Sequence, residues 1–150
     1  MIRRFLLSGV LSTAMAFVVL ATEPLKKGES YGGGTVAYLI PAAKNINKTQ
    51  GQHGVIAATT DLPTAMTWPE AKAACDSLSL NGYTDWVMPD KDDLNRLYLG
   101  KEILGEFMTT DYWSSSANEP DSAWSQRFLD GQKSVRSWTN HFRVRPIRKF

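Results

Sequence analysis

The residues best suited to bind a ligand gather in the last third of the chain. Residues 127–150 hold seven basic residues and one acidic residue, with aromatic side chains among them. A guanidinium group can bind a sulfate or carboxylate through two parallel hydrogen bonds, and an aromatic face can stack on a sugar ring. We therefore predict a ligand-binding surface built from Arg136, Trp138, His141, Arg143 and Arg145, joined by Tyr112 and Asn118.

The arginines of this surface have a second interpretation. They could instead be internal ion-pair partners of Asp85, Asp111 or Glu119. Residues 61–121 hold 12 acidic and four basic residues, so they could neutralise the basic end of the chain within one fold. The sequence leaves both interpretations open.

Three aromatic residues of two predicted strands could also stack on a sugar, namely Tyr112, Trp113 and Trp124. They lie in segments with the alternation of β-strands, where successive side chains face opposite sides. At least half of these rings are therefore expected in the core.

The loop Asn118-Glu119-Pro120-Asp121 places two carboxylates around a proline. Oxygen atoms of this kind are ligands for Ca²⁺, which needs about six to eight of them. No second acidic cluster follows in the sequence. We therefore predict an ordinary acidic turn and no cofactor, with Ca²⁺ held by Glu119 and Asp121 as the alternative.

The sequence offers no constellation for catalysis. Cys75 could in principle act with His53 or His141, but it lies on the apolar stripe of a predicted helix, where a thiolate is disfavoured. No nucleophile elbow, zinc-protease motif or phosphate-binding loop is present. We predict that the protein is not an enzyme and, with one cysteine, has no internal disulfide.

The N-terminus has the pattern of a secretory signal, because two arginines precede an apolar run from Phe5 to Ala21. Cleavage could follow Ala16 or Ala21, and an uncleaved membrane anchor is the alternative. We predict an exported protein of the periplasm, cell surface or medium, with residues 1–21 as signal, 22–30 as a polar tail and 31–150 as one domain.

Charge narrows the class of partner. The signal segment takes two of the 17 basic residues and none of the 15 acidic residues with it, so the remaining chain is formally neutral. Neutrality and export argue against a nucleic-acid partner. We expect a glycan or a surface protein as partner, membrane contact only through an uncleaved signal, and any homo-oligomer to form through the domain itself.

Local patterns predict the elements that position these residues. Residues 31–40 and 54–60 read as a β-hairpin with a long polar loop, 42–54. Thr67 with Glu70 begins a first helix that ends at Asn81-Gly82, and Asp90 caps a second helix. Period-two alternation then predicts an antiparallel meander with strands at 111–116, 123–128, 134–138 and 141–147.

This order of a hairpin, two helices and a meander predicts an α+β fold. The motifs that accompany it are Tyr31-Gly-Gly-Gly, Gly51-Gln-His-Gly-Val-Ile-Ala-Ala, Gly82-Tyr-Thr-Asp-Trp, Tyr112-Trp-Ser-Ser-Ser and Val144-Arg-x-Ile-Arg. In this combination the chain resembles the C-terminal domain family of the Legionella collagen-like protein, from about Gly28 to Phe150. The resemblance implies a C-type-lectin-like fold and a bacterial surface or exported domain, mostly of unassigned function.

Two positions depart from the family pattern. Val87 stands where a basic residue usually follows Asp-Trp, so Asp85 must pair with another arginine if it pairs at all. Pro146 stands where many members have a second cysteine. We expect a non-catalytic module for carbohydrate recognition or adhesion, with an anionic glycan as one ligand. The alternative is an assembly domain that acts through protein contacts.

Overall fold

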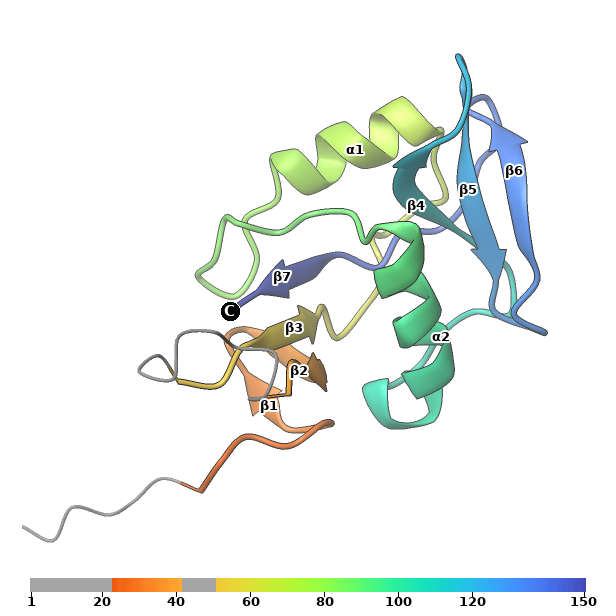
Figure 1. Cartoon of the computed structure of the whole chain (residues 1–150). Coiled ribbons are helices and arrows are strands. Elements are labelled where there is room, and N and C mark those ends of the chain that lie inside the picture. Colours follow the sequence, from red (N-terminus) through yellow and green to blue (C-terminus); the bar gives the residue numbers. More distant parts are fainter. Residues whose placement is uncertain (1–22, 42–50) are drawn as a thin grey trace, which may run out of the picture.

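Two antiparallel sheets and two helices make up the protein, in a computed structural model that describes residues 23–41 and 51–150. The first sheet has the strand order β1-β2-β3-β7 and the second β4-β5-β6. Figure 1 shows α2 between the two sheets and α1 above β7. The elements are β1 (Ser30–Tyr31), β2 (Gly34–Leu39), β3 (Gly54–Ala57), α1 (Trp68–Asp76), α2 (Lys91–Leu104), β4 (Asp111–Ala117), β5 (Ser122–Arg127), β6 (Lys133–Ser137) and β7 (Ile147–Lys149).

The predicted α+β class is confirmed, and so are the two helix starts. The backbone N–H of Thr67 donates to Glu70 Oε2 at 2.9 Å just before α1. Asp90 Oδ1 accepts from the N–H groups of Asp92 and Asp93 at the start of α2. These side chains satisfy backbone donors that have no partner in the first turn of a helix. The predicted signal segment and most of the predicted loop 42–54 lie outside the described residues.

The predicted end of the first helix is wrong. α1 stops at Asp76, and Asn81-Gly82 makes a separate turn. Asn81 and Gly82 both have positive φ, 53° and 81°, and they lie between Leu80 and Tyr83, which exchange two backbone hydrogen bonds. Two left-handed residues of this kind form a two-residue hairpin turn. Asn-Gly is therefore part of a hairpin turn here and not the end of the helix.

The segment 141–147 is also not a fourth strand of the meander. Its first part runs beside β4, where the Trp113 N–H donates to the Arg143 carbonyl at 2.9 Å. Its end becomes β7, which pairs with β3 in the other sheet. Val144 enters the core cluster against α1, and Ile147 enters the one against α2. Because each apolar side chain is stabilised by burial in a different core cluster, the chain passes from one sheet to the other between them.

The stretch before α2 is anchored to the last strand. Trp86 is 1% exposed, and its Nε1 donates to the Leu80 carbonyl at 3.1 Å. Arg148 of β7 donates to both carboxylate oxygens of Asp85, and its guanidinium lies 3.6 Å from the centre of the Tyr83 ring. Arg148 is therefore the partner of Asp85, which the sequence had left unnamed, and Trp86 is a core anchor.

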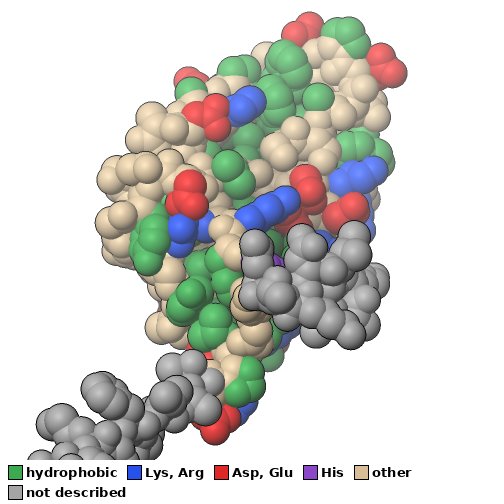
Figure 2. All heavy atoms as spheres, turned by 60° about the vertical axis from the view of Figure 1, so that its left-hand side comes forward, with side chains coloured by type: hydrophobic (Ala, Val, Ile, Leu, Met, Phe, Trp, Pro, Cys, Tyr) green, Lys and Arg blue, Asp and Glu red, His purple; other side chains and the backbone are tan. Residues whose placement is uncertain are grey.

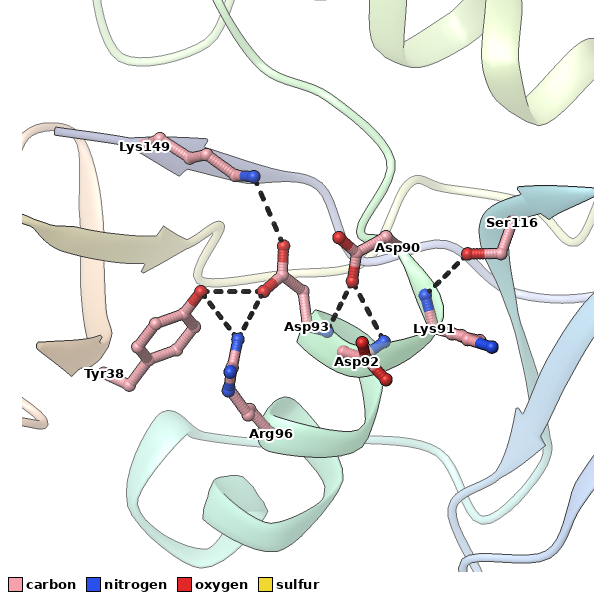
Figure 3. Close-up of polar contacts among 8 residues, drawn as sticks. All are labelled: Tyr38, Asp90, Lys91, Asp92, Asp93, Arg96, Ser116 and Lys149. Carbon is pink, nitrogen blue, oxygen red and sulfur yellow. Dashed lines mark hydrogen bonds and ion pairs between the residues drawn. The ribbon is translucent and has the colours of Figure 1, made fainter. Parts of the chain in front are cut away.

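A buried carboxylate fastens α2 to the first sheet, as Figure 3 shows. Asp93 is 3% exposed and accepts hydrogen bonds from the Tyr38 hydroxyl at 2.7 Å and from Arg96 at 3.1 Å. Lys149 Nζ lies 3.8 Å from its second oxygen. The side chains of β2, β7 and α2 thus satisfy a carboxylate that would be costly to bury alone.

This arrangement predicts a loss of stability at high pH. Burial, followed by the hydrogen bond to Asp93, raises the pKa of Tyr38 to about 12. A group whose pKa is raised on folding stabilises the folded protein at pH values below its unfolded pKa, which is about 10 for tyrosine. This stabilisation is lost as the pH rises through the folded pKa. We expect the difference in free energy of unfolding between the wild type and Tyr38→Phe to shrink between about pH 9 and about pH 12. Urea unfolding at a series of pH values measures it, and a constant difference would contradict the assignment.

Candidate functional site

A groove of about 670 Å³ contains two of the predicted site residues, Arg143 and Arg145. Two loops form its walls, and two of the predicted arginines lie between them. It is lined by residues 59–63, Glu106, Phe107, Met108, Arg143 and Arg145. We call it the Arg143 groove, because Arg145 is ion-paired within the fold whereas Arg143, among the described residues, is not.

The Arg145 side chain is buried and forms an internal ion pair. It is 1% exposed, and its Nε donates to Asp61 Oδ1 at 2.7 Å. Its other nitrogens donate to backbone carbonyls, including that of Glu106, and its guanidinium lies 4.0 Å from the centre of the Phe107 ring. These internal contacts occupy the Arg145 side chain, and the ligand contact predicted there stays untested. The internal ion pair is correct, although its partner is Asp61.

Tyr112 is also a structural residue. Its side chain is fully buried, and its hydroxyl donates to Asp61 Oδ2 at 2.7 Å while accepting from the Met108 N–H at 2.8 Å. Burial, with the hydrogen bond to Asp61, raises the pKa of Tyr112 well above its usual range. The fold occupies this side chain as well, and the ligand contact predicted at Tyr112 stays untested. Asp61, Arg145 and Tyr112 together form a buried network that holds the groove walls in place.

Arg143 remains available to a ligand. Its side chain is half-buried, and it donates one long hydrogen bond of 3.4 Å to the Pro63 carbonyl. Within residues 23–41 and 51–150 no carboxylate lies within ion-pair distance of it. Glu106 is exposed among the groove residues, and its carboxylate has no ion pair in the same ranges. The groove can thus offer guanidinium donors to an anion and carboxylate acceptors to hydroxyl groups.

The other predicted residues lie outside the groove lining. Trp138 stacks on Trp68 at the start of α1, with ring centres 4.7 Å apart and planes 10° apart. Arg136 on β6, His141 and Asn118 are exposed. Figure 2 shows, on the face turned forward, that Lys and Arg side chains lie beside Asp and Glu side chains. The predicted surface is therefore divided into separate places by the fold.

The loop considered for Ca²⁺ is a turn closed by its own residues. Ser122 Oγ accepts from the Glu119 N–H at 3.2 Å, and Asp121 has a φ of 64°. Both carboxylates are exposed. In the part of the chain that the structure describes, no three His, Cys, Asp or Glu side chains are grouped to hold a metal ion. Calcium at Glu119 and Asp121 stays an untested alternative.

Sequence reasoning missed Asp61 and Glu106. Asp61 lies 84 residues before Arg145, and no local pattern links the two. Glu106 follows the end of α2 and has the composition of an ordinary exposed residue. The excess of acidic residues in 61–121 indicated ion pairs with the basic end of the chain, but it did not identify which residues pair.

Comparison with known proteins supports the resemblance found in the sequence. A model of the Lcl C-terminal domain matches residues 44–148, which is more than half of the chain. A search of curated proteins returned no match. Over the described residues, no helix has the length and apolar character to cross a membrane. On the family match, the chain belongs to the Lcl C-terminal domain family.

Proposed function

We propose that the protein is an exported binding module without catalytic activity, which holds an anionic carbohydrate or a similar surface ligand in the Arg143 groove. The observation that carries this proposal is the half-buried Arg143, whose guanidinium lines the groove without a carboxylate partner among the described residues. A guanidinium with free N–H groups binds carboxylate and sulfate in a fixed geometry.

An acidic sugar also suits the second charged group of the groove. Glu106 offers acceptors for sugar hydroxyls, while Arg143 offers donors for the anionic group. The adjoining Asp61–Arg145–Tyr112 network is fully hydrogen-bonded and keeps the wall rigid. A preorganised wall lowers the entropic cost of binding.

The proposal includes a C-type-lectin-like fold. It is supported by the membership in the Lcl C-terminal domain family. The arrangement of early and last strands in one sheet, two helices, and a second small sheet is compatible with it. Recognition would then depend on loops and on the short second sheet, while the first sheet closes the domain.

Retention on immobilised heparin, beside neutral glycans and over a salt series, tests this function. We expect salt-sensitive retention on heparin, with about tenfold weaker binding in Arg143→Gln, because one charge-assisted contact is lost. Arg136→Gln is the matched control, since it removes the same charge from an exposed position on β6 outside the groove.

Equal losses in both variants would mean that net charge, rather than the groove, governs retention. If the folded protein is retained on none of the glycans, the glycan proposal fails. Concentration-dependent self-association without glycan binding would then favour the second candidate, an assembly domain that acts through protein contacts.

A further inference from the structure

A second cavity lies between the start of α2 and the second sheet. Its volume is about 180 Å³, which is smaller than the ~300–1,000 Å³ typical of pockets for drug-sized ligands. None of its residues belongs to the Arg143 groove. It is lined by Lys91, Asp92, Leu94, Ser114, Trp124, Ser125 and Lys133. We call it the Trp124 pocket.

Strand alternation sends the Trp124 ring into this pocket. Its neighbour Ala123 is buried in the core cluster that packs against α1, whereas Trp124 is partly exposed. Tyr112 and Trp113, the other two candidate rings, are fully buried. Among these three rings, Trp124 is therefore the one that can stack on a ligand.

Two lysines line the pocket together with the ring. Lys91 Nζ lies 5.6 Å from the centre of the Trp124 ring, and Lys133 reaches the pocket from β6. Both side chains are exposed, and neither has an ion pair within residues 23–41 and 51–150. The backbone N–H of Lys91 donates to Ser116 Oγ at 3.0 Å, which fixes the base of this side chain against β4 (Figure 3).

We propose that the Trp124 pocket binds a single pyranose ring that carries an anionic group. The sugar ring stacks on Trp124, and Lys91 and Lys133 hold its carboxylate or sulfate. Asp92, also exposed and without an ion pair in these ranges, accepts from ring hydroxyls. The volume of about 180 Å³ lies below the range typical of drug-sized ligands, which favours a single ring over an oligosaccharide. This inference goes beyond the proposed function, because it assigns a second site for an anionic sugar, separate from the Arg143 groove.

Titration of the ¹⁵N-labelled protein with glucuronate, glucose 6-sulfate and glucose tests the proposal. We expect the indole signal of Trp124 to shift with the two anionic sugars at millimolar concentration, and much less with glucose. Lys133→Gln should weaken binding about tenfold. Arg136→Gln is the matched control, because residues 133 and 136 lie on opposite faces of β6.

Glucuronate and glucose 6-sulfate distinguish a carboxylated from a sulfated ligand, and binding of either supports the proposal. Equal binding of glucose would overturn the role of the lysines. An unshifted Trp124 signal with all three sugars would overturn the site, as would equal effects of Lys133→Gln and Arg136→Gln in proteins with native circular dichroism.

The two sites can fail independently. Normal monosaccharide binding in Arg143→Gln, together with lost heparin retention, supports both. Sugar binding at Trp124 by a protein that heparin does not retain would overturn the groove proposal and leave the Trp124 pocket supported.

Discussion

Arg145→Leu is expected to lower the free energy of unfolding by about 3–5 kcal/mol, the usual cost of removing one partner of a buried ion pair. The substitution leaves Asp61 largely buried with the Tyr112 hydroxyl as its remaining side-chain donor. It also removes the donors to the carbonyls of Ala58 and Glu106. Leucine is shorter and cannot restore these hydrogen bonds.

Urea unfolding of Arg145→Leu, Asp61→Leu and the double variant measures this coupling. Because each single change strands a buried charge, the double variant should lose less stability than the sum of the two. Arg143→Leu is the control, since that arginine has no ion pair in the described residues and should change stability by about 1 kcal/mol or less. A loss below 1 kcal/mol in Arg145→Leu would contradict the network.

Trp86→Ala should cost a similar amount, about 3–5 kcal/mol, since it empties a large volume in the core. Trp86 is among the largest fully buried side chains and packs with Ile56 and Ala58. The change also leaves the Leu80 carbonyl without its indole donor. The Arg148 guanidinium, 5.7 Å from the ring centre, would lose packing as well.

Trp124→Ala is the matched control for this cavity. It deletes the same side chain at a partly exposed position, where less volume is enclosed. Thermal and urea unfolding of both variants should show the larger loss in Trp86→Ala. Equal losses would mean that Trp124 is a core residue, which would also weaken the case for the Trp124 pocket.

Interactions between near neighbours were predictable from the sequence. The caps at Thr67 and Asp90 depend on side chains within three positions, so the residue types predict them directly. At least half of the three candidate rings were expected in the core, and Tyr112 and Trp113 are both fully buried, although alternation alone would have exposed one of these two neighbours. Asn81-Gly82 indicated a break in the chain, but the choice between a helix end and a hairpin turn depends on where the following chain packs.

The candidate site was predictable only in part. Residue types singled out the arginines of the last segment, but they did not show that Arg145 and Arg148 form internal ion pairs while Arg143 lines the groove without one among the described residues. Burial makes this difference, and the three residues look equivalent in the sequence. Nothing in the sequence marks Lys91 as a ligand contact, because it lies on a helix 33 residues before Trp124 and only the fold brings the two together.

The sequence by itself determined the α+β class, the helix starts and the family, since these depend on local patterns and on motifs in order. The tertiary structure decided which charges are paired and which remain free to meet a ligand. A carboxylate and an arginine far apart in the chain pair only when packing brings both out of water, where an unpaired charge is costly. Asp61 and Arg145 meet under that condition, and Arg143 does not.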